Sequence, residues 1–141
     1  MNGEEITKLL KATLPKHYNF FLLHKDQIFY HLLKPNNILI FNVDKHWLCL
    51  LFHNNGKLFF IDSLGNPFSF YFPNIIIYPK PVQLFSSPIQ SKNSSLCGHY
   101  VVFVAKLLCS KFNVEQVKNM LSSNNSNIND ILLVNFFRYG K

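Results

Sequence analysis

The pattern of hydrophobic and polar residues divides this chain into helical segments at both ends and strands in between. Residues 4–14 place apolar side chains at helical spacing with lysines opposite, which predicts an amphipathic first helix ending before Pro15. The segment 17–33 is aromatic and apolar without a clear period, so we expect a packed loop or a short helix against the core. A turn is predicted at residues 35–37.

Three apolar runs predict β-strands at residues 37–43, 46–53 and 57–62. The second and third runs are separated by the sequence Asn54-Asn55-Gly56, and Asn-Gly between apolar runs is a strong hairpin signal. Because these runs are almost continuously hydrophobic, the sheet should be covered on both faces. A further short strand is predicted around residues 75–79.

Three helices are predicted in the last third of the chain. The first begins at Cys97 and continues for a dozen mostly apolar residues, which is typical of a helix buried on all sides. Two shorter helices are expected at residues 114–121 and 128–137, with Asn127 as the candidate N-cap of the last one.

A cysteine therefore stands where a buried helix begins. Unpaired backbone N–H groups and the positive end of the helix dipole favour an anion there, so the thiol of Cys97 should ionise more easily than a free thiol of pKa about 8.5. Gly98 removes the side chain that would crowd whatever approaches the sulfur. Isolated cysteines are more often small core residues, so a chemical role depends on residues upstream.

A thiolate nucleophile needs a base beside it, and that base needs an acceptor to orient it. His46 opens the first hairpin strand and Asp62 closes the second. With a two-residue loop, Asp62 pairs with Cys49 and points to the opposite face from His46. With a three-residue loop ending at a left-handed Gly56, Asp62 pairs with Leu48, and the base and acid share one face roughly 7–8 Å apart. We favour the three-residue loop or a bulge.

An oxyanion site would complete the chemistry. The backbone N–H of Cys97 could supply one donor, and the side-chain amide of Gln90, seven positions earlier, could supply a second. Taken singly, each of these residues has an ordinary structural role open to it. His46 could simply end a strand, Asp62 could cap a turn, and Gln90 could be a loop residue.

Composition narrows the class of protein. A chain of 141 residues with 48% hydrophobic and 16% aromatic residues fits one globular domain. No apolar run approaches the roughly 18 residues of a membrane span, and no signal peptide is seen, so we expect a protein kept inside a cell or particle. The three cysteines (Cys49, Cys97 and Cys109) form no CxxC pair, and the six histidines lack paired ligand spacing. A disulfide scaffold and a metal site are therefore not expected.

The net charge of +7 and the pI of about 9.4 favour polyanionic partners. The lysines, however, are spread singly along the chain, and Arg138 is the one arginine. An AT-rich genome would produce the same composition without a chemical reason. A non-catalytic basic protein that binds DNA or capsids is therefore an alternative, although such a module gains nothing from keeping His, Asp, Gln and Cys together.

Four short motifs occur in the order His, Asp, Gln, Cys: HW at 46–47, IDSLG at 61–65, Gln90, and LCGHY at 96–100. This set resembles the adenovirus-protease and ubiquitin-like-protein protease superfamily of cysteine peptidases, whereas papain-like enzymes have Cys before His. The stretch QSKNSSLCG is especially similar to the adenovirus-type branch. The resemblance covers about residues 5–112.

The resemblance implies catalytic roles for four residues. Cys97 would be the nucleophile, His46 the general base and later acid, Asp62 the residue that orients His46, and Gln90 the oxyanion donor. The adenovirus enzyme has Glu at the position of Asp62, and the other relatives have Asp there. Both are carboxylates, so the role is the same.

The resemblance also implies the fold and the substrate surface. It predicts an α+β, papain-like cysteine protease architecture, with a central, mostly antiparallel sheet packed against the buried helix that starts at Cys97. Residues 1–141 would form a single protease domain. Trp47 and Gly98 would belong to the substrate-binding surface.

Viral members of this family cleave structural precursors after small residues, commonly glycine, during particle maturation. We therefore expect a cysteine endopeptidase acting on capsid precursors, present in the infected cell and packaged in the virion. The resemblance implies no cofactor, but it implies stimulation by DNA. No cysteine lies between Asp62 and Gln90, where the adenovirus protein has the one that binds an activating peptide.

The alternative enzyme is a protease that removes SUMO or ubiquitin-like tags. It would need a surface that grips a folded partner, and no long insertion supplies one. The oligomeric state is left open by the sequence.

Overall fold

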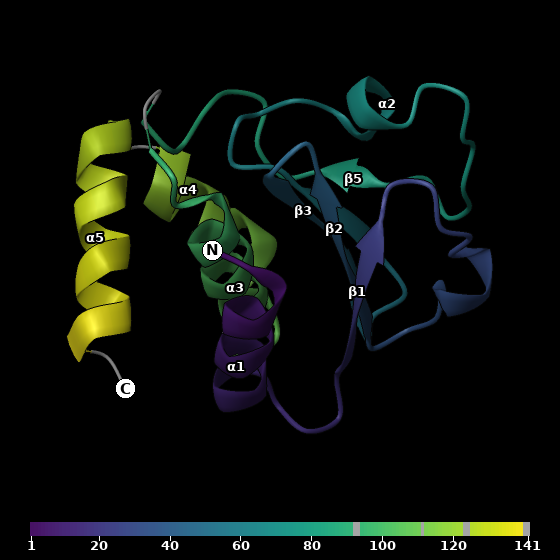
Figure 1. The fold of residues 1–141 in the computed structure, drawn as a ribbon, viewed down its shortest axis with the longest axis horizontal. Coiled ribbons are helices and arrows are strands. Elements are labelled where there is room, and N and C mark those ends of the chain that lie inside the picture. The colour runs from purple at the N-terminus through teal and green to yellow at the C-terminus, as the bar shows by residue number, and fades with distance from the viewer. Residues whose placement is uncertain (92–93, 111, 123–124, 140–141) are drawn as a thin grey trace.

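The computed structural model describes residues 1–91, 94–110, 112–122 and 125–139. These residues form an α+β fold in which a five-stranded sheet lies beside a group of helices (Figure 1). The strands are β1 (Asn19–His24), β2 (Asn37–Val43), β3 (His46–Phe52), β4 (Leu58–Ile61) and β5 (Val82–Gln83). The helices are α1 (Gly3–Thr13), the 3₁₀ helix η1 (Tyr30–Leu32), α2 (Phe68–Tyr71), α3 (Cys97–Leu108), α4 (Val114–Ser122) and α5 (Ser126–Tyr139).

The sheet is covered on both faces, as its hydrophobic strands predict. Along β2, Ile38 and Ile40 belong to the core shared with α1 and α3, whereas Leu39 and Phe41 belong to a second core on the opposite face. This second core contains aromatic side chains from α2 and from the segment before η1. Successive strand residues point to opposite faces, so a strand buried on both sides has no polar alternation.

The expectation of a mostly antiparallel sheet is wrong. The strand order β1-β2-β3-β4-β5 contains two antiparallel pairs in the middle, but both outer pairs are parallel. Asn19 pairs with Asn37, and Phe59 pairs with Val82. The chain crosses over between the partners of each parallel pair, because such strands cannot be joined by a tight hairpin.

Two local predictions also need correction. The segment 17–33 contains β1 as well as the short helix η1, so the loop-or-helix interpretation missed a strand. The inner residues of β1 are half-buried at the sheet edge, which removes the alternation that would have marked a strand. No strand forms at 75–79. The chain instead pairs with β4 at Val82–Gln83, after Pro79 and Pro81, neither of which can donate a ladder hydrogen bond.

The hairpin between β3 and β4 has the three-residue loop that the sequence favours. The His53 N–H donates to the Lys57 carbonyl at 2.9 Å, which closes the loop 54–56. Gly56 has a φ of 90°, a left-handed conformation that glycine adopts at little cost. Cys49 pairs with Ile61, so the same register places Leu48 opposite Asp62.

The four longer helices, α1, α3, α4 and α5, follow the sequence pattern closely, whereas the short helix α2 was not predicted. In α3, every residue except His99 and Lys106 is buried, in agreement with the prediction of a helix surrounded by core. The proposed N-cap of the last helix is wrong, because α5 begins at Ser126 and Asn127 lies inside it. Asn125 takes that role, and its Oδ1 accepts a hydrogen bond from the Ile128 N–H at 2.9 Å.

Candidate active site

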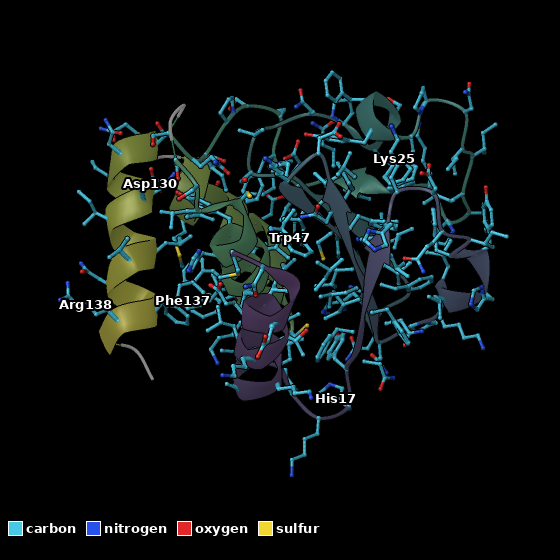
Figure 2. The ribbon with its side chains drawn as sticks, viewed as in Figure 1. His17, Lys25, Trp47, Asp130, Phe137 and Arg138 are labelled. Carbon is cyan, nitrogen blue, oxygen red and sulfur yellow. The ribbon has the colours of Figure 1, made fainter. Side chains whose placement is uncertain are left out.

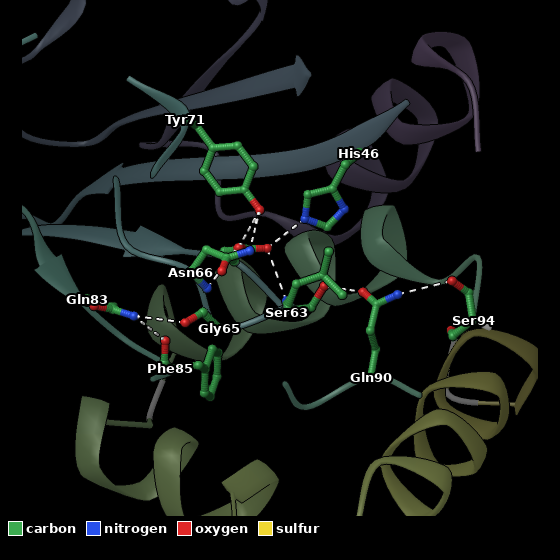
Figure 3. Close-up of polar contacts among 11 residues, drawn as sticks. His46, Ser63, Gly65, Asn66, Tyr71, Gln83, Phe85, Gln90 and Ser94 are labelled. Carbon is green, nitrogen blue, oxygen red and sulfur yellow. Dashed lines mark hydrogen bonds and ion pairs between the residues drawn. The ribbon is translucent and has the colours of Figure 1, made fainter. Parts of the chain in front are cut away.

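His46 and Asp62 meet at the end of the hairpin. His46 is the first residue of β3, and Asp62 directly follows β4. The ring Nε2 of His46 lies 2.6 Å from Oδ1 of Asp62 (Figure 3). The carboxylate is almost fully buried, with 1% of its side chain exposed, and the imidazole is 15% exposed. Nδ1 is then the ring nitrogen left for a second partner.

The Asp62 carboxylate is held by four hydrogen bonds. Oδ1 accepts from the His46 ring and from the Leu64 N–H at 3.0 Å. Oδ2 accepts from the Tyr71 hydroxyl at 2.6 Å and the Asn66 N–H at 3.1 Å. Burial by itself would raise the pKa of Asp62, but its hydrogen bonds, to His46 first, lower that pKa instead. Asp62 is therefore a fixed anion beside the imidazole.

The Cys97 side chain lies close enough to the His46 side chain for each to shift the pKa of the other. Burial alone would raise the pKa of the Cys97 thiol, but the interactions with His46 and with the backbone of Trp47 and Gly98 lower it. Burial would likewise lower the pKa of His46, whereas its interactions with Asp62 and Cys97 raise that pKa to about 9. Each shift favours the charged form, so the pair tends toward thiolate and imidazolium.

The other two cysteines lack this environment. Cys49 lies in the core, and burial raises the pKa of its thiol. Cys109 is half-buried, and burial raises the pKa of its thiol to about 12. Cys97 is thus the cysteine whose surroundings favour the thiolate.

Tyr71 is a site residue that the sequence did not reveal. It lies in the four-residue helix α2, and its hydroxyl donates to Asp62 (Figure 3). Its ring stacks on the His46 ring with centroids 6.1 Å apart. The Asn66 side chain also donates to the Tyr71 hydroxyl, at 3.1 Å. Nothing in the local pattern marks this tyrosine, since its role arises only when the loop after Asp62 folds back.

Gln90 lies next to the same loop, with only 4% of its surface exposed. Its side-chain oxygen accepts a hydrogen bond from the hydroxyl of Ser63, the neighbour of Asp62. Its Nε2 donates to the Ser94 carbonyl at 3.1 Å (Figure 3). An amide nitrogen carries two hydrogens, so one N–H of Gln90 is bonded to the loop that precedes α3, and the second can donate to another acceptor.

Trp47 and Gly98 lie against each other, with Met1 beside them. A Cβ on Gly98 would lie 2.9 Å from the Met1 sulfur and 3.1 Å from Trp47 Cδ1, so a side chain at this position would require a rearrangement. The Trp47 indole N–H donates to the Met1 carbonyl at 2.9 Å. Trp47 lies at the junction between the sheet and the helix layer (Figure 2). These two residues, which the resemblance assigns to substrate binding, therefore lie against each other next to Cys97.

Among the residues that the structure covers, no three His, Cys, Asp or Glu side chains are grouped so as to hold a metal ion. In the same part of the chain, no helix combines the length and apolar character needed to cross a membrane.

In comparisons with known proteins, no family model matches this chain, and no curated protein matches it either.

Proposed function

We propose that this protein is a cysteine endopeptidase with Cys97 as nucleophile. The proposal rests on the His46 imidazole, which bonds the Asp62 carboxylate through Nε2 and lies close enough to Cys97 for the two side chains to shift each other's pKa toward the charged forms. The nucleophile stands at the start of a buried helix, and base and acid stand at adjacent strand ends. Nucleophile, base and orienting acid are the three parts that covalent acyl transfer requires.

In the first half of the reaction, the Cys97 thiolate attacks the carbonyl carbon of the scissile peptide bond. A carbon–sulfur bond forms, and the carbonyl electron pair moves to oxygen. Gln90 and the Cys97 N–H are the proposed donors to this oxyanion. The protonated His46 then gives its proton to the leaving nitrogen, the carbon–nitrogen bond breaks, and a thioester remains.

In the second half, neutral His46 takes a proton from water, and the resulting hydroxide attacks the thioester. The carbon–sulfur bond breaks, a carboxylic acid is released, and the thiolate and imidazolium are restored. Since the pKa of His46 is raised to about 9, the imidazolium needed in the first half is present below that pH and is lost above it.

The substrate class rests on the resemblance of the ordered residues His46, Asp62, Gln90 and Cys97 to the adenovirus-type branch. We propose that the substrates are capsid or other structural precursor proteins, cleaved after small residues such as glycine during particle maturation. The enzyme would act in the infected cell and the virion. The α+β fold, with α3 packed on a sheet that carries the base and acid, is compatible with a papain-like architecture.

The basic character of the chain supports stimulation by non-specific DNA binding, because a net charge of +7 attracts polyanions. This part of the proposal is tested by adding DNA to the cleavage reaction at low and high salt. Stimulation that fades with salt supports an electrostatic contact. Identical rates with and without DNA contradict it.

The test of the central proposal uses purified wild type, Cys97→Ala and the matched variant Cys109→Ala. Each is incubated with a capsid precursor from the same genome, and products are identified by intact mass. We expect cleavage by wild type and by Cys109→Ala, but not by Cys97→Ala. The new termini of the products give the specificity. In parallel, iodoacetamide at mildly acidic pH should label Cys97 before Cys49 and Cys109.

Other outcomes favour the alternatives. Hydrolysis of a SUMO or ubiquitin reporter with no precursor cleavage favours a tag-removing protease. Equal labelling of all three cysteines together with no cleavage contradicts the enzyme and favours a DNA- or capsid-binding protein.

A further inference from the structure

Helix α5 contacts the chain on both sides of Gln90. On the preceding side, the Asn129 side-chain nitrogen donates to the Ile89 carbonyl at 2.9 Å. The same nitrogen donates to the Leu121 carbonyl at 2.7 Å, near the end of α4. Asn129 is fully buried, so both donors of its amide are used to join two segments of backbone.

On the following side, the Asp130 carboxylate holds Ser91. Oδ2 of Asp130 accepts from the Ser91 hydroxyl at 2.6 Å and lies 3.4 Å from the Ser91 N–H. Oδ1 accepts from the Tyr100 hydroxyl at 2.6 Å. Tyr100 is fully buried in α3, three residues after Cys97, so one carboxylate joins the Gln90 loop to the helix that carries the nucleophile.

A simpler role for Asp130 is stabilisation of α5 through the helix dipole, since it lies near the N-terminal end of that helix. That role requires no partner outside α5. Here both oxygens accept hydrogen bonds from other segments, and the adjacent Asn129 reaches the same loop. Two consecutive residues of α5 thus fix the two neighbours of Gln90.

We infer that Asn129 and Asp130 are positioning residues that act through Gln90, an inference that rests on the proposed function. An oxyanion donor stabilises the transition state only when its N–H already points at the developing charge. The Gln90 side chain is bonded to Ser63 and Ser94, and α5 fixes the backbone from which it projects. Helix α5 lies at the outer edge of the helix layer and contacts α3 through Phe137, 5.0 Å from the His99 ring (Figures 1 and 2).

The test is a double-mutant cycle between Asp130→Asn and Gln90→Ala. The probe is a peptide with glycine before a fluorogenic leaving amine, and kcat and KM are measured separately. In the wild-type background, Asp130→Asn should lower kcat about 10–100-fold, as expected for a displaced catalytic group. In the Gln90→Ala background, the same change should alter kcat by less than about twofold, because the group it positions is gone.

Two further readouts separate positioning from general damage. The pH dependence of Cys97 alkylation reports on the thiol, His46 and Asp62, and it should not change in Asp130→Asn. Asn135→Ala, on the exposed side of α5, is the matched control and should keep wild-type kcat. Ser91→Ala removes only the hydroxyl that Asp130 binds, so it replaces Asp130→Asn if that variant does not fold.

Equal losses of kcat in both backgrounds would overturn the inference, as would an alkylation profile that changes with Asp130. Either result leaves the proposed function standing if wild type turns over and Cys97→Ala does not. A wild type that shows no acyl transfer overturns the proposed function, and the inference with it.

Discussion

His46 and Asp62 are 16 positions apart and meet across a hairpin, whereas the loop that carries Gln90 is anchored on residues 39 and 40 positions away. The first half of the site is set by the register of two neighbouring strands. The second half depends on α5, which comes after every other helix and strand in the sequence. The strand half should therefore tolerate changes in α5, and the loop half should not.

Each chemical property of the candidate site originates in one of these two halves. The charged state of Cys97 depends on His46 and, through it, on Asp62. Stabilisation of an oxyanion would depend on Gln90 and the segments that hold it. Thiol reactivity and turnover are therefore separate readouts of the two halves.

The largest expected effect comes from Asp62→Asn, which damages the strand half. An amide in place of the carboxylate presents N–H groups to donors, and it no longer stabilises the imidazolium. Turnover should fall by about 10²–10⁴-fold, the usual contribution of general acid–base catalysis, and selective alkylation of Cys97 at mildly acidic pH should disappear. Steady-state kinetics and alkylation rates measure the two effects.

The control for this change is Glu115→Gln, which likewise replaces a carboxylate by an amide, at an exposed position in α4. It should leave both readouts unchanged. Retention of wild-type turnover by a folded Asp62→Asn variant would contradict the role assigned to Asp62.

Gln90→Ala is the corresponding change in the loop half. Turnover should fall by about 10²–10³-fold, as for removal of one oxyanion donor, while the alkylation rate of Cys97 stays at the wild-type value. Gln27→Ala, at an exposed position after β1, is the control. Loss of thiol reactivity in Gln90→Ala would show that the two halves are not separable.

Tyr71→Phe tests a contact that lies within the strand half but comes from a separate helix. A buried hydrogen bond to a charged group contributes about 1.5–3 kcal/mol, so the free energy of unfolding at pH 7 should fall by that amount. Chemical denaturation measures it. Tyr78→Phe, at a residue that is 92% exposed, should have no effect.

The same variant should change the acid stability of the fold. The folded pKa of Asp62 is lowered below 3.8, so its stabilisation is present above that pH and is lost as the pH falls through the folded pKa. Removing the Tyr71 hydroxyl brings the folded pKa closer to 3.8, so the variant should lose less free energy of unfolding than wild type as the pH falls below about 4. An unchanged acid-unfolding curve would contradict this account of the carboxylate.

The smallest effect is expected at the hairpin loop. Gly56 has a φ of 90°, and no neighbouring atom lies within 4 Å of a Cβ built there, so Gly56→Ala adds backbone strain without a clash. The cost should be about 1–2 kcal/mol, measured by thermal unfolding. Gly56→Asn should cost less, because asparagine tolerates this conformation. Equal Tm values for glycine and alanine would indicate that the loop does not hold the register.

Much of the fold could be predicted because its signals are local. The strands at 37–43 and 46–53 and the buried helix from Cys97 each consist of a long apolar run with clear boundaries. The parallel strands β1 and β5 could not be predicted in this way. Their partners lie across long connections, and their own residues are only partly buried or too few to form a pattern.

The features of the candidate site also separate into those with a local sequence signal and those without one. The sequence shows the order His46, Asp62, Gln90 and Cys97 and predicts that Cys97 begins a buried helix. It favours, over a two-residue alternative, the hairpin loop that puts His46 and Asp62 on one face, and the structure establishes that loop. These features depend on residue type and on spacing along one or two adjacent elements.

The hydrogen-bond partners that surround these residues depend on the tertiary structure. Tyr71 reaches the Asp62 carboxylate, and Asn129 and Asp130 reach the Gln90 loop, through side chains whose local sequence carries no sign of the contact. The physical reason is that a buried polar group must find a hydrogen-bond partner. Which partner it finds depends on the packing of distant segments, and no local pattern encodes that packing.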